Sequence, residues 1–327
     1  MNISARSIIN AGAALLLGSL ATPLRADILY ASFYNGQRIG KYTSDGVPAV
    51  FATVGTGEFP VGLAFDMAGN LYVSNFGTPD DVEKITPAGV SSAFASGLRA
   101  PVGLAFDNSG NLYVADEGAN LIRKFTPDGI GSVFASSGLS FPTGIAFDSV
   151  GNLFVANAYG TFADTIVKFT PDGVGSVFAD SGLSAPTGLA FDSAGNLYVT
   201  NNGNNTIEKF TLDGIGSVFA SGLQWPVGIA FDSADNLYVA HFLDTIVKFT
   251  PDGVGSIFAN PVPGFNNPQF LAFTDDAGVP LKLPNQRAVV PEPSTGIMGM
   301  ALCLPVLLGL SHPRRKPGSR RRKCATR

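Results

Sequence analysis

Five polar residues recur at nearly equal intervals along the chain, and their types are those that bind ligands or transfer protons. Each follows a short apolar run beginning Leu-Tyr-Val or Leu-Phe-Val, and the intervals are 40 to 44 residues. The five are Asn75, Asp116, Asn157, Asn201 and His241. Oxygens of Asn and Asp suit hard cations, and a His beside an Asp suits acid–base chemistry. We therefore take these five as the candidate ligand-binding residues.

An internal repeat must position these residues. The run Gly-Leu/Ile-Ala-Phe-Asp occurs five times, and Phe270–Thr274 is a degenerate sixth copy. The steps between copies are 41, 41, 44, 40 and 42 residues. A period of this length with several short strands per unit is typical of a β-propeller. Alternating apolar residues between Asp, Gly and Pro turns predict four antiparallel strands in each unit.

The two ends of the repeat array predict how the ring closes. The chain enters at Ile28–Ala31, which matches the second strand of a unit, and it leaves after Phe270–Thr274, which matches a first strand. One blade is therefore expected to combine three N-terminal strands with one C-terminal strand, leaving no unpaired inner edge. The predicted fold class is all-β: a six-bladed β-propeller of four-stranded antiparallel blades.

Two rings of residues are expected around one face of this propeller, which we call the mouth. The outer ring holds the five candidates and Phe33. The inner ring, just before the repeated glycine, is Val61, Val102, Thr143, Thr187, Val227 and Gln269. The repeats over residues 28–274 resemble NHL repeats, a propeller family that includes enzymes, ligand sensors and interaction surfaces.

Resemblance to gluconolactonase-like propellers implies a divalent metal held by Asn and Asp, several of them at the inner-ring position. Valine cannot ligate a metal, and calcium or magnesium needs several hard oxygen ligands. We therefore expect no metal and no cofactor. Streptogramin-lyase-type chemistry needs an acid–base group, for which His241 beside Asp116 is the one candidate; the alternative is that His241 is an exposed rim residue.

Other acidic residues have simpler interpretations. The Asp that ends each repeated run precedes a turn, where a carboxylate accepts backbone N–H groups. These residues are Asp66, Asp107, Asp148, Asp192 and Asp232. The loops 80–83 and 116–117 are acidic and unique to their blades, so they are either solvated acids or weak sites for calcium or a cationic ligand.

Both ends of the chain resemble sorting signals. Arg6, an apolar stretch and Ala26 predict a signal peptide over 1–26. A propeller over 27–275 and a linker over 276–290 follow. The segment 291–327 resembles a PEP-CTERM signal: the motif Pro291, Glu292 and Pro293, an apolar helix over 296–310, and a basic end. The resemblance implies export by the secretion machinery, transient anchoring by that transmembrane helix, and cleavage by an exosortase-type protease. The alternative is a permanent anchor.

Charge limits the partners. The whole chain has a formal net charge of −4, but residues 27–290 hold 24 acidic and 11 basic residues. An acidic body repels phosphate backbones, so nucleic acid is excluded as a partner. The two cysteines, Cys303 and Cys324, lie in the tail, so the body has no thiolate site.

Three functions are compatible with these features. The leading hypothesis is an exported cell-surface or matrix protein that binds a small molecule, glycan or protein at the mouth without catalysis. The second is an extracytoplasmic lactonase-like or lyase-like enzyme with an atypical centre. The third is a structural component of an extracellular polysaccharide layer, in which exopolysaccharide or protein is the partner.

Overall fold

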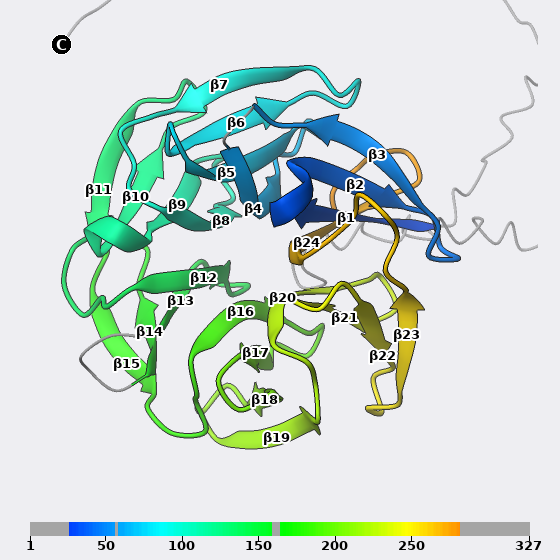
Figure 1. Cartoon of the computed structure of the whole chain (residues 1–327). Coiled ribbons are helices and arrows are strands. Elements are labelled where there is room, and N and C mark those ends of the chain that lie inside the picture. Colours follow the sequence, from blue (N-terminus) through cyan, green and yellow to red (C-terminus); the bar gives the residue numbers. More distant parts are fainter. Residues whose placement is uncertain (1–25, 56–57, 159–163, 282–327) are drawn as a thin grey trace, which may run out of the picture. The chain divides into compact units, whose positions relative to one another are not determined.

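Six four-stranded antiparallel sheets are arranged around a central axis in the computed structural model, which describes residues 26–55, 58–158 and 164–281 (Figure 1). We number the sheets as blades 1 to 6, beginning with the blade that contains the N-terminal strand. The predicted all-β six-bladed propeller is confirmed. The predicted signal peptide before Ala26, the linker beyond Leu281 and the sorting signal lie outside the described residues. Within the described residues, no helix has the length and apolar character needed to cross a bilayer.

The strands fall into four concentric positions. The innermost strands of blades 1 to 6 are β24 (Pro268–Asp275), β4 (Glu58–Phe65), β8 (Pro101–Phe106), β12 (Pro142–Phe147), β16 (Pro186–Phe191) and β20 (Pro226–Phe231). The second strands are β1 (Asp27–Phe33), β5 (Leu71–Gly77), β9 (Leu112–Asp116), β13 (Leu153–Asn157), β17 (Leu197–Asn201) and β21 (Leu237–His241). The short 3-10 helices η1 (Tyr34–Gly36) and η2 (Glu117–Ala119) follow β1 and β9.

The outer half of each blade is built from the remaining strands. The third strands are β2 (Arg38–Tyr42), β6 (Asp81–Ile85), β10 (Leu121–Phe125), β14 (Thr165–Phe169), β18 (Thr206–Phe210) and β22 (Ile246–Phe249). The outermost strands are β3 (Pro48–Thr53), β7 (Ser91–Ala95), β11 (Gly131–Ala135), β15 (Gly175–Ala179), β19 (Gly216–Ser221) and β23 (Gly255–Ala259).

Blade 1 closes the ring as predicted. Its strand order is β24-β1-β2-β3, so the last strand of the array pairs with the first. Antiparallel pairing aligns Leu29 with Phe273 and Ala31 with Leu271. The inner edge of β1 is therefore paired, and backbone hydrogen bonds join the two ends of the repeat array.

Neighbouring blades approach most closely at the repeated glycine of the innermost strand. A Cβ atom placed on Gly62 would lie 2.0 Å from the carbonyl oxygen of Val102 in the next blade. The corresponding distance is 2.1 Å between Gly144 and the carbonyl oxygen of Thr187. Because the obstructing atom belongs to the backbone, no side-chain rotation relieves the clash. The innermost strands therefore require glycine here, and the repeat preserves it in five copies.

Six buried clusters fill the spaces between blades, one for each blade junction. A recurring aromatic contact joins them: the ring that follows Leu in each second strand meets, edge to face, the Phe near the end of the next innermost strand. The Tyr72 and Phe106 ring centroids, for example, lie 4.9 Å apart at an interplanar angle of 75°. Edge-to-face pairs of this kind add about 0.5–1.5 kcal/mol beyond area burial. The periodic sequence thus gives a ring of nearly equivalent, rigid junctions.

Candidate functional site

The five candidate residues lie where the second strands end, as predicted, but they are buried rather than exposed. The exposed fraction is 0% for Asn75, Asp116 and Asn201, 4% for Asn157 and 5% for His241. In blades 3, 4 and 5 the loop that leads into the blade contacts the candidate residue on the mouth face. The alternative of an exposed rim position for His241 is therefore wrong, because the sequence pattern does not show where these loops run.

In blades 4 and 5 the candidate asparagine fixes the covering loop. The Asn157 Oδ1 accepts a hydrogen bond from the backbone N–H of Ser140 at 3.1 Å, and its Nδ2 donates to the carbonyl oxygen of Gly138 at 2.9 Å. Asn201 makes the equivalent contacts with Ser184 and Gly182. A buried amide satisfied in this way costs little to bury and orders the loop above it.

In blade 3 the same position is charged. Asp116 Oδ1 accepts a hydrogen bond from the backbone N–H of Arg99 at 2.7 Å. Its Oδ2 accepts one from Arg123 Nε at 2.6 Å, and Arg123 is on the adjacent strand β10. The carboxylate is therefore neutralised by a partner in its own blade, which disfavours a role as a free acid or base.

Blade 2 departs from this pattern and concentrates acidic groups. Asn75 Nδ2 donates to Asp81 Oδ1 at 3.0 Å, whereas Asn75 Oδ1 and Glu83 Oε2 are buried without a hydrogen-bond partner. Burial is the main cause that raises the pKa of Asp81 and of Glu83 above their ordinary values. The negative charge of Glu58 adds to this effect at both carboxyl groups. Asp80 instead accepts backbone hydrogen bonds from Gly77 and Ala100.

His241 does not have the surroundings of a general acid or base. Its Nδ1 lies 3.1 Å from the Thr245 hydroxyl, and its Nε2 is buried without a hydrogen-bond partner. Burial lowers the pKa of His241 to about 4, so the ring is neutral at pH 7. Asp116 is in blade 3 and His241 in blade 6, on opposite sides of the ring. The expected pairing of His241 with Asp116 is therefore wrong.

Two threonines of the inner ring bond to neighbouring blades. Thr143 Oγ1 donates to the carbonyl oxygen of Pro186 at 2.9 Å, and Thr187 Oγ1 donates to that of Pro226 at 3.2 Å. These hydroxyls thus link neighbouring blades instead of converging on the axis. Across residues 26–55, 58–158 and 164–281, no group of three or more His, Cys, Asp or Glu side chains is arranged to hold a metal ion.

A set of residues that the sequence analysis missed lies at the mouth, and of these Phe141 and Trp225 are exposed, at 41% and 50%, whereas Asn267 is buried. The residue before the proline of an innermost strand has a positive φ in five blades: Ala100, Phe141, Ala185, Trp225 and Asn267. This backbone conformation is unusual for a bulky residue directly before proline. Two hydrogen bonds stabilise it at Trp225. The backbone N–H of Trp225 donates to Asn205 Oδ1 at 2.8 Å, and its carbonyl oxygen accepts from the backbone N–H of Phe242 at 3.1 Å.

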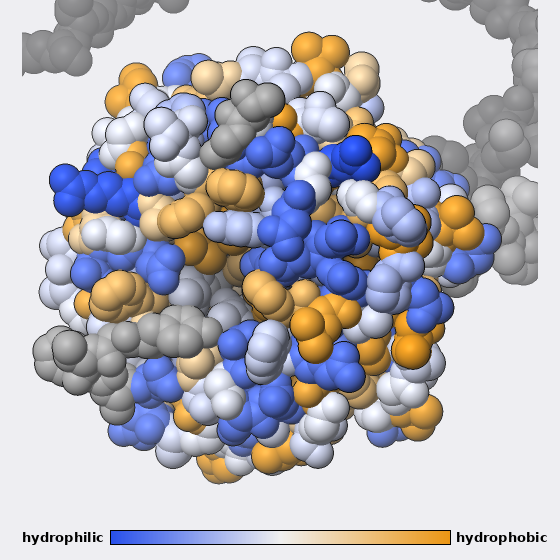
Figure 2. Space-filling view, in the orientation of Figure 1, coloured by the Kyte–Doolittle hydropathy of each residue, from blue (hydrophilic) through white to orange (hydrophobic). Residues whose placement is uncertain are grey.

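Two groups of aromatic rings lie on the mouth face. The Trp225 ring, 50% exposed, meets Phe242 with centroids 5.8 Å apart. On the other side of blade 1, Tyr34 stacks on Phe59 at 4.6 Å and lies 6.4 Å from Phe76. Figure 2 shows this face hollowed around the axis, with hydrophilic side chains gathered over β1 and β24 beside the hollow.

The turn aspartates lie on the opposite face, and their predicted structural role is confirmed. Asp107 Oδ1 accepts hydrogen bonds from the backbone N–H groups of Ser109 and Asn111, both at 2.9 Å. Its Oδ2 lies 3.5 Å from Lys124 Nζ, and that ammonium also lies over the Tyr113 ring. Equivalent carboxylate–lysine pairs form at Asp66, Asp192 and Asp232.

Comparison with known proteins agrees with this architecture. The NHL repeat family matches residues 98–125 and 183–210, which are corresponding parts of blades 3 and 5. A comparison with curated protein sequences gave no match.

Solved structures share the fold at low sequence identity. A streptogramin B lyase is 20% identical with a TM-score of 0.54, covering 73% of this chain and 75% of its own. A virginiamycin B lyase from Staphylococcus aureus is 20% identical with a TM-score of 0.55, covering 76% and 82%. A protein provisionally named a gluconolactonase is 18% identical with a TM-score of 0.57, covering 67% and 82%. The chain thus contains NHL repeats in a six-bladed propeller whose fold resembles that of streptogramin-type lyases and gluconolactonase-like proteins.

Proposed function

We propose that this chain is an exported propeller that binds a ligand at its mouth without catalysing a reaction. The observation that carries the proposal is the pair of aromatic groups on either side of blade 1, in which Trp225, Phe242 and Phe76 are exposed. Trp225 and Phe242 form one group, and Tyr34, Phe59 and Phe76 form the other. Aromatic rings that pack on one another at the surface provide contact area at a small entropic cost, which is the property of a binding surface.

A glycan fits this surface as the ligand, because aromatic faces pack against the C–H faces of sugar rings. Hydrophilic side chains gather beside the hollow (Figure 2), where they can bind sugar hydroxyl groups. The amides of Asn267 and Gln269 are 3% and 9% exposed and hydrogen-bond to each other, so they support this surface from below. In this proposal Asp116, Asn157 and Asn201 contribute from below, by holding the loops that form the binding surface, whereas Asn75 and His241 are buried at the equivalent positions of blades 2 and 6.

The surroundings of the titratable candidates support binding over catalysis. Asp116 is paired with Arg123, and His241 is neutral and lies across the ring from it. General acid–base catalysis requires a donor and an acceptor that reach the same substrate. The resemblance to lyases extends to the fold, and fold alone does not fix function.

Binding at the mouth can be tested by replacing Trp225 and Phe242 with alanine in the full chain. We expect at least a tenfold loss of affinity for glycans, measured on immobilised polysaccharides of the producing cell and on a defined oligosaccharide panel. The control is Leu212→Ala, because Leu212 is also an exposed apolar residue, 70% exposed, but belongs to a turn far from the mouth. Unchanged binding in the folded Trp225→Ala/Phe242→Ala variant would exclude the mouth as the site.

Export is a separate part of the proposal. It is supported by the predicted signal peptide over 1–26 and by the motif at Pro291, Glu292 and Pro293. Intact mass of the protein recovered from outside the cell should show loss of both segments. A mature protein that retains residues up to Arg327 would refute processing by an exosortase-type protease.

A further inference from the structure

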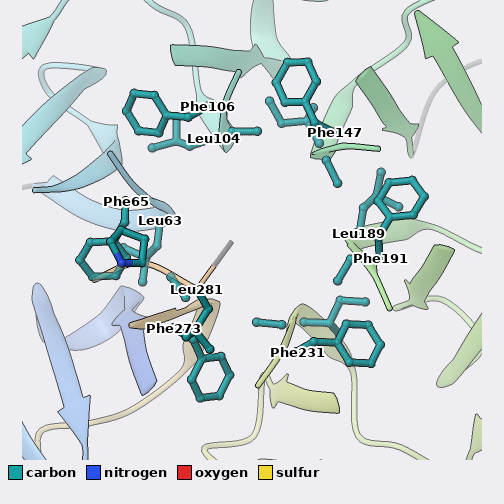
Figure 3. A pocket seen from close by; sticks show the side chains of 18 of the residues that line it. Leu63, Phe65, Leu104, Phe106, Phe147, Leu189, Phe191, Phe231, Phe273 and Leu281 are labelled. Carbon is teal, nitrogen blue, oxygen red and sulfur yellow. The ribbon is translucent and has the colours of Figure 1, made fainter. Parts of the chain in front are cut away.

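An apolar cavity lies on the axis at the face opposite the mouth. Its volume is about 700 Å³, within the range of small-molecule sites. A phenylalanine from each innermost strand lines it: Phe65, Phe106, Phe147, Phe191, Phe231 and Phe273. In Figure 3 the six follow one another in the opposite rotational sense to their strands in Figure 1, so the two figures view opposite faces.

Aliphatic side chains form a second layer of the wall. Two residues before the phenylalanine, five of the six innermost strands contribute a Leu or Ile, including Leu63, Leu104 and Leu189. Figure 3 shows these leucines pointing toward the open centre. The cavity opens to solvent at this face, so a ligand that covers its Leu and Phe side chains removes apolar surface from water. A cavity of this size and lining therefore suits a mainly apolar occupant.

The wall is rigid before any ligand arrives. Each lining phenylalanine is held edge to face by an aromatic ring of the preceding blade, with centroids between 4.9 and 5.1 Å apart. A preformed wall avoids the entropic cost of ordering side chains on binding. The geometry therefore suits tight binding of a ligand whose surface is mainly apolar.

Charges at the rim are already paired, which restricts the ligand to a neutral molecule. Asp107 lies 3.5 Å from Lys124, and Asp232 lies 3.6 Å from Lys248. Each carboxylate also accepts a hydrogen bond at 2.7 Å from a neighbouring asparagine. An ionised ligand would lose its hydration without gaining a partner. The polar side chains of Asn108 and Ser233 remain at the rim, where they suit one uncharged polar group.

The C-terminal end of the described chain forms part of the rim. After β24 the chain turns back, so that the Leu281 N–H donates to the Phe273 carbonyl oxygen at 3.2 Å. This turn places Val279, Pro280 and Leu281 in the cavity wall, and Figure 3 shows Leu281 beside Phe273. The first residues of the predicted linker therefore belong to the propeller.

We propose that this cavity is a second binding site, for a neutral and mainly hydrocarbon molecule with one uncharged polar group. At the packing density of protein interiors, its volume accommodates on the order of 25 non-hydrogen atoms. The site is independent of the mouth, because its wall comes from the ends of the innermost strands rather than their beginnings.

The neutral fluorophore N-phenyl-1-naphthylamine tests the proposal with the full chain. We expect saturable binding of one probe per chain, with enhanced fluorescence. Two variants should each raise the Kd at least tenfold. Leu281→Glu places a charge at the rim, and Leu63→Trp/Leu189→Trp fills the cavity from opposite blades. Leu212→Glu, the same change as at Leu281 but on an exposed turn, should leave the Kd unchanged. All variants are measured in the same detergent, so partitioning of the probe into micelles is common to them and cancels in the comparison.

Three results would overturn the proposal. The first is a wild-type chain that shows no saturable binding. The second is an unchanged Kd in the folded Leu281→Glu variant. This variant alters a terminal turn rather than a blade, so it should fold even if the tryptophan variant does not. The third is binding that arises only after the segment beyond residue 290 is removed, which would show that the chain's own apolar run 296–310 fills the cavity.

Discussion

Arg123 Nε donates a hydrogen bond to Asp116 Oδ2 at 2.6 Å, across the adjacent strands β10 and β9. The carboxylate is fully buried, and its other oxygen holds the loop that leads into blade 3. The arginine is about one-third exposed. Asp116 has the carboxyl group that a catalytic acid would need, but together with Arg123 it holds the loop in place.

Replacing Arg123 with methionine should leave Asp116 buried without a counter-charge. We expect a loss of about 3–5 kcal/mol in the free energy of unfolding, measured by urea denaturation at pH 7. The double variant Asp116→Asn/Arg123→Met should recover most of the loss, because blades 4 and 5 carry asparagine at this position. A double variant no more stable than Arg123→Met would contradict this assignment.

Substituting alanine for Gly144 should strain the junction between blades 4 and 5. The added Cβ would lie 2.1 Å from the carbonyl oxygen of Thr187, so one of the two innermost strands has to shift. Overpacking of this kind costs about 1–3 kcal/mol, measurable as a lower Tm. Ser132→Ala, on the exposed part of β11, is the control and should change the Tm little. An unaltered Tm for Gly144→Ala would show that the blades are less tightly spaced.

His241 should make the fold sensitive to acid. Burial lowers its pKa from 6.5 to about 4, so the unfolded chain binds a proton more readily than the folded one. The free energy of unfolding is therefore highest above pH 6.5, and it decreases by on the order of 3 kcal/mol as the pH falls toward 4. His241→Asn should remove this dependence, since asparagine occupies the equivalent position in blades 4 and 5. Equal pH slopes for the two proteins, from denaturation at several pH values, would refute this.

Glu83 should have the opposite effect on pH dependence. Burial raises the pKa of Glu83 and of Asp81, so the folded chain binds protons more readily than the unfolded one. Their ionisation destabilises the fold as the pH rises above the ordinary carboxyl range. Glu83→Gln should therefore raise the unfolding free energy at pH 7 by about 1 kcal/mol, with little change at pH 4. The exposed Asp213→Asn serves as control, and a destabilised Glu83→Gln would contradict the assignment.

Most of the fold was predictable because the sequence repeats. The alternation in Gly-Leu-Ala-Phe-Asp determines strand faces, and the incomplete units at the two ends predict that β24 pairs with β1. The tight contact at Gly62 was not predictable as such, since the pattern indicates small residues near the axis without showing which atom of the next blade they meet.

The site was predicted less well, for a physical reason. Asn157 was correctly placed at a strand end, but its burial depends on the loop through Gly138 and Ser140. Those contacts use backbone atoms, which leave no mark in the side-chain pattern. Trp225 could have been found from the sequence, because the residue before the proline of each innermost strand differs from blade to blade whereas the residues around it repeat.

Closure of the ring by β24 has a consequence for the order of events during synthesis. The partner of β1 lies in Pro268–Asp275, so the ribosome must make nearly the whole array before blade 1 can be completed. At usual rates of elongation this delay is on the order of 10–50 s. Throughout that time the inner edge of β1 is open to pairing with other strands. A nascent chain that stalls before β24 therefore carries an unprotected edge, and completion of translation is what removes it.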